Sequence, residues 1–292
     1  MPIKKEADRI RWGVERRLEF IEFRLYWEDG VNRADLSQEF GVSTPQASSD
    51  LRLYQDLAAS NLKYDSSMKR YVATEHFRPY FLDLTADRYL IKLRDFAAGH
   101  TNFLDSWLSA LPDTDSMPIP ARKISSTVLR EVLRAMRNQE SIDVDYLSMS
   151  PNSGGSAGWR RISPHAFGFD GIRWHVRAFC HRSEVFKDFV LTRCRSVKDP
   201  GKVGALGESD KLWNETINAR LKPNPAMSEM QQQIIAEDYS MTNLELDISI
   251  RKALYFYFEK HLRLDIPVDL KNPLATPLVL SNKQEIQASM RN

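Results

Sequence analysis

Arginine and histidine side chains concentrate between Trp159 and Arg195, and this stretch holds the groups best suited to bind an anion. Residues 121–200 contain 14 Lys and Arg against 8 Asp and Glu, whereas the whole chain has a net charge of only +2. A guanidinium group can donate two parallel hydrogen bonds to the oxygens of one phosphate. A basic excess confined to one segment predicts a local anion site, with a basic face that only keeps the domain soluble as the alternative.

A hairpin signal lies at the centre of this stretch, where Asp170-Gly171 separates two strand-like runs. Asp-Gly readily forms a tight turn between antiparallel strands. Because side chains alternate sides along a strand, the second run is expected to divide into two faces. The expected core face holds Trp174, Val176 and Ala178, and the expected anion-binding face holds Arg173, His175 and Arg177.

The elements around the hairpin favour a small barrel. Ser141 to Ser148 alternates apolar and polar residues as a half-buried strand does, and residues 151–158 are rich in Gly and Ser as a loop is. Together with the stretch from Trp159, this gives roughly five short strands in about 60 residues, which is typical of a small barrel.

The amino-terminal third shows a helix-turn-helix pattern. A helix is predicted from Arg9 to Glu28, followed by two short helices joined at Gly41-Val42-Ser43. Gly41 permits the left-handed turn, and Ser43 or Thr44 can cap the second helix. The predicted shared core consists of Leu36, Phe40, Val42, Ala47, Leu51 and Tyr54.

The outer face of the second short helix carries short or polar side chains that can meet base edges in a major groove. A two-stranded wing is predicted over residues 62–73, with basic residues for phosphate contacts. The DNA-binding candidates are Thr44, Gln46, Ser48, Ser49 and Arg52 on the helix, and Lys63, Lys69 and Arg70 on the wing. A helical protein-interaction module is the alternative. Because the segment is not basic overall, two copies are expected to act together on a two-fold DNA site.

The rest of the chain supplies a connector and a carboxy-terminal domain. A helix is predicted from Phe77 to Gly99, a proline-rich linker from Leu111 to Pro120, and a helix from Ser125 to Asn138. A strand over residues 244–250 and an aromatic-rich helix over residues 253–262 indicate a final small α+β domain. The predicted domains are residues 1–76, 77–124, 125–200 and 201–292.

Composition indicates an ordinary soluble protein of the cytoplasm. The hydrophobic content of 42% and charged content of 27% are typical of globular chains, and no apolar run is long enough for a membrane span. The two cysteines, Cys180 and Cys194, are expected to be buried and unbridged. No metal-binding spacing and no cofactor motif is present, so neither a metal nor a cofactor is expected.

Enzyme motifs are missing from the sequence. There is no glycine-rich phosphate loop, no His-Glu-x-x-His pair and no Gly-x-Ser-x-Gly elbow. The strongest enzymatic alternative is a nuclease that uses His165 and His175. The sequence favours a protein that is not an enzyme.

Three runs carry a family resemblance: Arg161 to His165, Arg173 to Cys180, and Phe189 to Arg193. They resemble the WYL domain, a small Sm-like (SH3-like) barrel of bacterial regulators. The order of winged helix, barrel and carboxy-terminal extension resembles the WYL-type transcriptional regulators. Residues 43–54 resemble the subgroup associated with anti-phage defence islands such as BREX and CBASS. Here Trp174-His175-Val176 stands where Trp-Tyr-Leu is usual, and the resemblance implies a core position for Trp174.

The resemblance also implies a ligand pocket in the barrel and an α+β multidomain fold. The implied pocket residues are Tyr146, Ser148, Arg161, His165, Arg177 and Arg193, with Arg173, His175 and Arg182 as secondary candidates. Each of them could instead be a surface residue or the partner of a structural ion pair, and His165 could cap the barrel. Arginine, serine and aromatic groups suit a nucleotide or a single-stranded nucleic acid.

The expected function is a homodimeric, sequence-specific DNA-binding repressor on a palindromic operator. It would regulate its own gene, a phage-defence operon, or both. The barrel ligand would release it by binding the DNA-free arrangement better than the DNA-bound one. An activator with the same architecture and a nucleic-acid-binding adaptor without an operator are the alternatives.

Overall fold

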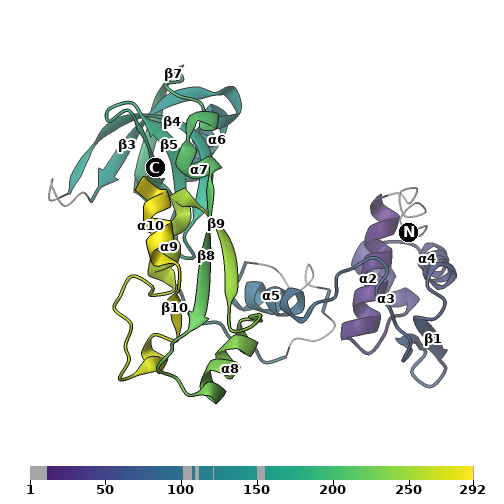
Figure 1. Cartoon of the computed structure of the whole chain (residues 1–292). Coiled ribbons are helices and arrows are strands. Elements are labelled where there is room, and N and C mark those ends of the chain that lie inside the picture. The colour runs from purple at the N-terminus through teal and green to yellow at the C-terminus, as the bar shows by residue number, and fades with distance from the viewer. Residues whose placement is uncertain (1–11, 101–106, 109–111, 121, 150–154, 292) are drawn as a thin grey trace. The chain divides into compact units, whose positions relative to one another are not determined.

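A computed structural model describes residues 12–100, 107–108, 112–120, 122–149 and 155–291 (Figure 1). The chain forms two compact units, Met1–Pro118 and Ile119–Asn292, called here the N-terminal and C-terminal units. In the described part of the chain, no helix is long and apolar enough to cross a membrane. The predicted α+β fold is confirmed, because each unit combines helices with antiparallel strands.

The N-terminal unit is a winged helix-turn-helix. Its elements are α2 (Trp12–Trp27), α3 (Arg33–Phe40), α4 (Thr44–Leu57), β1 (Leu62–Asp65), β2 (Arg70–Ala73) and α5 (Ala86–Ala97). Local chemistry sets the turn between α3 and α4. Gly41 adopts the left-handed conformation with φ 64°, and the Ser43 hydroxyl accepts a hydrogen bond from the backbone N–H of Gln46.

The predicted helix-turn-helix core is confirmed. Leu36, Ala47 and Tyr54 are fully buried, Leu51 is 4% exposed, and Phe40 and Val42 pack against them. Apolar residues of α2 close the same core from the other side. The outer face of α4 is therefore left to polar residues.

The predicted helix from Phe77 to Gly99 is wrong over its first nine residues, because α5 begins at Ala86. Residues 80–82 are irregular, and their backbone N–H groups donate to the carboxylate of Glu22 at 2.6, 2.7 and 2.7 Å. Glu22 lies in α2 and is fully buried. A long-range acceptor thus replaces the helical hydrogen bonds that the local pattern favoured.

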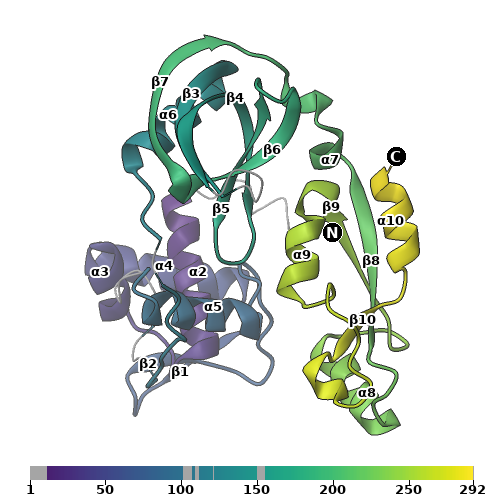
Figure 2. The same cartoon turned by 90° about the vertical axis from the view of Figure 1, so that its left-hand side faces the viewer.

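The C-terminal unit begins with α6 (Ser126–Asn138), which Ser125 caps, and a five-stranded antiparallel sheet in the order β6-β5-β4-β3-β7. The sheet curls into a barrel, and α6 lies against it (Figure 2). The strands are β3 (Glu140–Ser148), β4 (Ser156–Phe169), β5 (Trp174–Cys180), β6 (Val185–Val190) and β7 (Cys194–Lys202), with the 3-10 turn η3 (Leu191–Arg193) before β7. The predicted small barrel is confirmed.

The predicted hairpin between β4 and β5 is present, and Gly171 has φ 92°. Its connection spans residues 170–173 and not Asp170-Gly171 alone, because β5 begins at Trp174 and not at Ile172. The prediction that Trp174 is a core residue is wrong. Trp174 is 47% exposed, because it pairs with Phe169 at the turn end of the hairpin, where the two strands leave the barrel core. Val176 and Ala178 do lie in the core, as predicted.

Cys180 and Cys194 are buried free thiols. This agrees with the prediction of two unbridged cysteines. Both pack in the core of the barrel with the apolar residues of β3 and β5.

The final domain is an α+β unit built on a three-stranded sheet in the order β10-β8-β9. The 3-10 turn η4 (Gly207–Ser209) and the short helix α7 (Lys211–Asn214) lead into it. Helices α9 and α10 pack on one part of β8, and α8 packs on another. The elements are β8 (Thr216–Pro223), α8 (Glu229–Asp238), β9 (Leu246–Arg251), η5 (Lys252–Leu254), α9 (Tyr255–His261), η6 (Pro273–Ala275), β10 (Leu278–Leu280) and α10 (Lys283–Arg291).

Candidate functional site

Helix α4 presents every predicted base-reading residue to solvent. Ser48 and Ser49 donate from their hydroxyls to the backbone carbonyls of Thr44 and Pro45, which holds both side chains close to the helix. Gln46 donates from Nε2 to Oδ1 of Asp50 at 3.0 Å. Arg52 makes no hydrogen bond or ion pair with a described residue, so its guanidinium is available to a base or a phosphate.

The three basic residues predicted on the wing differ in their surroundings: two are exposed lysines, and the third is an arginine in an ion pair. Lys63 and Lys69 are exposed, and Lys69 lies in the turn between β1 and β2 with φ 54°. Arg70 is half-buried, and its Nη2 lies 3.3 Å from Oδ2 of Asp35. Asp35 is also the capping-box residue of α3, so Arg70 ties the wing to the helix-turn-helix.

A pocket of about 840 Å³ opens in the barrel. Of the six predicted ligand residues, the structure places Tyr146, Ser148 and Arg193 on its lining, together with the secondary candidate Arg182. The remaining lining residues are Met149, Ser156, Ala157, Arg160, Cys180, Ser183, Lys187, Asp188 and Phe189.

Sequence reasoning missed Arg160 and Lys187, which also line the pocket. Strand parity would have found them. Arg160 stands two residues before Ile162, Lys187 stands two residues before Phe189, and both apolar residues lie in the core. Side chains two apart on a strand share a face, so both cations lie on the inward face of the sheet.

The structure keeps Arg161, His165 and Arg177 off the pocket lining. Arg161 is paired across the sheet with Asp143 in a bidentate contact of 2.9 and 2.8 Å. Arg177 is paired across the sheet with Asp188 on the same outer face. The parity that turns Arg160 inward turns Arg161 outward. Arg161 and Arg177 each bind a carboxylate of the protein.

The expected row of exposed donors at Arg173, His175 and Arg177 is also corrected. His175 is 2% exposed and Arg177 is 4% exposed. Residues from the carboxy-terminal third of the chain cover this face of β5, and Tyr257 of α9 lies over His175 with ring centroids 4.6 Å apart. Arg173 binds Asp170 at 2.9 Å.

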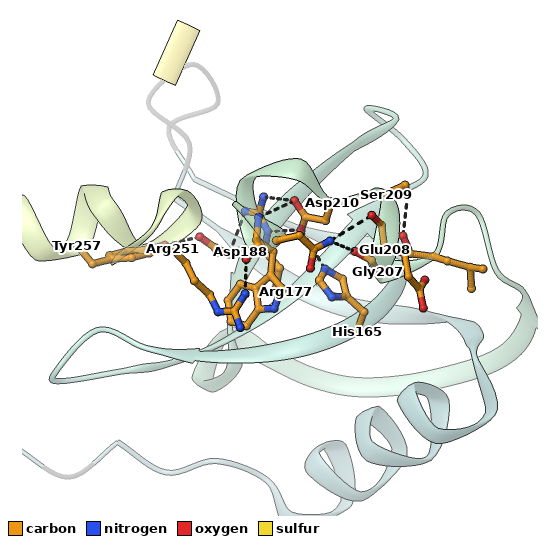
Figure 3. A network of polar contacts seen from close by, with 12 residues as sticks. His165, Arg177, Asp188, Gly207, Glu208, Ser209, Asp210, Arg251 and Tyr257 are labelled. Atoms are coloured by element: carbon orange, nitrogen blue, oxygen red, sulfur yellow. Dashed lines mark hydrogen bonds and ion pairs between the residues drawn. The ribbon is translucent and has the colours of Figure 1, made fainter. Parts of the chain in front are cut away.

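A buried polar network occupies this outer face, and Figure 3 shows its central residues. Arg177 donates from Nε and Nη2 to Asp210 at 2.7 and 3.0 Å, and from Nη1 to Asp188 at 3.2 Å. His165 Nε2 lies 3.0 Å from Asp210, and the Tyr257 hydroxyl donates to Asp188 at 3.0 Å. The network joins the barrel to α9 of the final domain.

Burial and hydrogen bonds shift the pKa values of Asp210 and His165 in this network. Burial would raise the pKa of Asp210, but the hydrogen bonds from Arg177 and His165 outweigh it and hold this pKa below its ordinary value. Burial lowers the pKa of His165 despite the neighbouring carboxylate. His165 is therefore neutral near pH 7 and adds no charge for an anionic ligand.

In the described ranges no group of three or more His, Cys, Asp or Glu residues is placed to hold a metal. The polar groups of the C-terminal unit instead form ion pairs on the outer face and a cationic lining in the pocket. These two sets of residues are adjacent, because Asp188 belongs to the network and also lines the pocket.

Three family models match successive parts of the chain. Residues 13–95 match the BrxR transcriptional regulator winged helix-turn-helix domain, and residues 127–199 match the WYL domain. Residues 216–286 match the BrxR transcriptional regulator C-terminal dimerization domain. The same three models follow one another in the order of the folded domains.

Full-length relatives agree with these matches. The DNA-binding transcriptional repressor CapW of Pseudomonas aeruginosa is 37% identical over 286 residues, which cover 98% of this chain and 95% of the relative. CapW of Stenotrophomonas maltophilia is 36% identical over 286 residues, with the same coverage. CapW of Escherichia coli (strain KTE188) is 36% identical over 288 residues, or 99% and 95% of the two chains.

The chain belongs to the WYL-domain regulators of the BrxR and CapW type. The predicted family of WYL-type transcriptional regulators is thus confirmed. The members named above are transcriptional repressors, and the family is one of regulators rather than enzymes. This disfavours the nuclease alternative.

Proposed function

We propose that this protein is a homodimeric DNA-binding transcriptional repressor that acts on a palindromic operator. The observation that carries the proposal is the exposed polar face of α4, which leaves Arg52 unpaired at the position of a recognition helix. The names of the CapW relatives and the match to a dimerization domain support it. Two copies would place two recognition helices on the half-sites of one operator.

Within this proposal the domains have separate tasks. Residues 1–76 bind the operator, residues 77–124 connect, residues 125–200 sense a ligand, and residues 201–292 hold two copies together. The proposed ligand is a nucleotide or a single-stranded nucleic acid, because the pocket gathers Arg160, Arg182, Lys187 and Arg193. Release from the operator requires that the ligand bind the DNA-free arrangement more tightly.

Replacing Arg52 by alanine tests the operator site. We expect operator affinity to fall by about 1–3 kcal/mol, because Arg52 would lose its contact with a base. Affinity is measured by fluorescence anisotropy on a duplex selected from random sequences by the wild-type protein. Gln46→Ala should also weaken binding to this duplex. In the wild type the Gln46 amide must leave Asp50 before it can contact a base.

The matched control is Arg88→Ala. Arg88 is an arginine of the same unit that lies in α5 with its side chain 64% exposed. It should bind the duplex like the wild type. Normal binding by both Arg52→Ala and Gln46→Ala would contradict the proposed reading face, and a reporter gene that falls silent when the protein is deleted would indicate an activator.

Replacing Tyr257 by phenylalanine tests whether the pocket communicates with the final domain. The Tyr257 hydroxyl donates to Asp188, and this carboxylate lines the pocket. An anionic ligand would repel Asp188 and weaken this contact. We expect Tyr257→Phe to bind the operator normally and to need a different ligand concentration for release, measured by titrating the ligand into the protein–operator complex.

Tyr255→Phe is the control for this experiment, because the Tyr255 hydroxyl donates to Glu259 of its own helix and to no other described residue. It should respond to the ligand as the wild type does. If Tyr257→Phe also responds like the wild type, the contact does not carry the signal.

A further inference from the structure

The charged residues on the pocket lining are mostly cations. Arg160, Arg182, Lys187 and Arg193 make no ion pair with a described carboxylate, although all four line one pocket. Elsewhere in the same unit exposed arginines do find partners, as Arg195 does with Asp145 at 2.7 Å. Unneutralised cations around one cavity favour a ligand with several negative charges.

The aromatic rings of the pocket are closed to stacking. Its lining contains Tyr146 and Phe189, which are 9% and 5% exposed and pack edge to face at 5.1 Å. The Tyr146 hydroxyl accepts a hydrogen bond from the backbone N–H of Val190 at 3.2 Å. The expectation that aromatic faces of the pocket stack on a base is therefore corrected, because stacking needs an exposed ring face.

The carboxylate of Asp188, which lines the pocket, already has partners within the protein. Asp188 accepts from Arg177 through Oδ1 and from Tyr257 through Oδ2. Reading the edge of a base requires acceptors for its amino groups as well as donors for its carbonyls. The lining serines can donate as well as accept, and with the carboxylate bound internally the charged groups that face the ligand are cations. These groups match phosphate oxygens, which only accept.

We propose that the pocket recognises a chain of phosphate groups and leaves any attached bases unread. The four cations would bind about two phosphate groups, since arginine favours bidentate contacts with phosphate oxygens. This rests on the proposed ligand-sensing function and narrows it to a chemical class. The phosphodiester backbone of a single strand and an inorganic polyphosphate both belong to that class.

The first test compares probes on the full-length protein. A fluorescein-labelled single-stranded phosphodiester oligomer without bases is titrated beside oligothymidylate and oligoadenylate of the same length. We expect the three affinities to agree within about threefold, whereas stacking would favour the base-bearing strands by roughly fivefold or more for each stacked base. Thymidine without phosphate should not compete. Preference for one base-bearing strand, or no binding of the abasic oligomer, would overturn the inference.

Tripolyphosphate then distinguishes the two sources. Displacement of the abasic oligomer by tripolyphosphate at equal or lower phosphate concentration would assign the pocket to free polyphosphate. Displacement only at much higher concentration would assign it to a nucleic-acid backbone. Both results support recognition through phosphate, and absence of displacement at any concentration would contradict it.

The second test locates the probe. Arg182→Gln and Lys187→Gln should each lower the affinity for the abasic oligomer by roughly three- to tenfold. Each should also reduce the slope of log affinity against log salt concentration by about 0.7. Arg195→Gln is the matched control, since Arg195 is exposed in the same barrel and paired outside the pocket. It should leave both values unchanged.

Arg52→Ala separates this inference from the proposed operator site. It should bind the abasic oligomer like the wild type even though it binds the operator more weakly. If Arg52→Ala loses the oligomer while the pocket variants keep it, the probe lies on the N-terminal unit and the inference falls. If Arg52→Ala keeps the operator, the proposed reading face fails and the pocket result stands on its own.

Discussion

Replacing Asp210 by alanine is expected to lower the free energy of unfolding of the C-terminal unit by about 3–5 kcal/mol. Asp210 is 1% exposed and binds Arg177 through both oxygens. It also contacts His165 and accepts from the backbone N–H of Trp213 at the start of α7. Its removal leaves the buried guanidinium of Arg177 with one carboxylate instead of two, which is costly in a low-dielectric site.

Urea denaturation followed by circular dichroism measures this loss. Asp145→Ala is the control, because its ion pair with the 51% exposed Arg195 should contribute at most about 1 kcal/mol. Similar small losses in both variants would show that the network around Asp210 does not stabilise the unit.

Acidification provides a second measure of the same contact. The pKa of Asp210 lies below its ordinary value in the folded protein. Its contribution is therefore fully present above the unfolded pKa of about 3.9 and is lost as the pH falls through the lower folded value. The stability difference between wild type and Asp210→Ala should narrow as the pH falls below about 4. If the stability difference between wild type and Asp210→Ala stayed constant with pH, the charge of Asp210 would not be the source of its stabilising effect.

Replacing Glu22 by alanine is expected to destabilise the N-terminal unit by about 4 kcal/mol or more, since each buried donor left without an acceptor costs about 1–3 kcal/mol. The Glu22 carboxylate accepts from the backbone N–H groups of Tyr80, Phe81 and Leu82. It also accepts from the hydroxyl of Tyr54, which is fully buried in the helix-turn-helix core. The variant would remove the carboxylate that accepts from all four donors.

The loss is measured by urea denaturation followed by tryptophan fluorescence. Glu19→Ala is the control in the same helix, because Glu19 forms a surface ion pair with Arg16. It should change the unfolding free energy by less than about 1 kcal/mol. A Glu22→Ala protein as stable as Glu19→Ala would mean that water replaces the carboxylate at little cost.

Local signals predicted much of the fold. The turn between α3 and α4 depends on Gly41 and Ser43, which act on the residues beside them, and the structure contains both. The helix-turn-helix core and the five short strands followed from apolar spacing, since burial of one face sets the period. The assignment to WYL regulators came from motifs and domain order, and the relatives confirm it.

Side-chain environments were harder to predict. Basic residues of the barrel looked equivalent in the sequence, yet Arg160 lines the pocket while Arg161 binds Asp143. The two differ only in strand parity. Only the register of β3 against β4 places Asp143 opposite Arg161. Arg177 likewise faces Asp210, a residue 33 positions away in the chain.

The sequence by itself determined most helices, strands and turns, because caps, glycines and apolar periods act over a few residues. The exception is residues 77–85, where the buried carboxylate of Glu22 holds the backbone of residues 80–82 out of a helix. The sequence also determined the family, because the family's motifs are short and ordered. Only the tertiary structure decided which charges remain available. A charge is neutralised by whichever carboxylate the fold brings within a few ångströms, and for Arg177 that carboxylate comes from a distant segment.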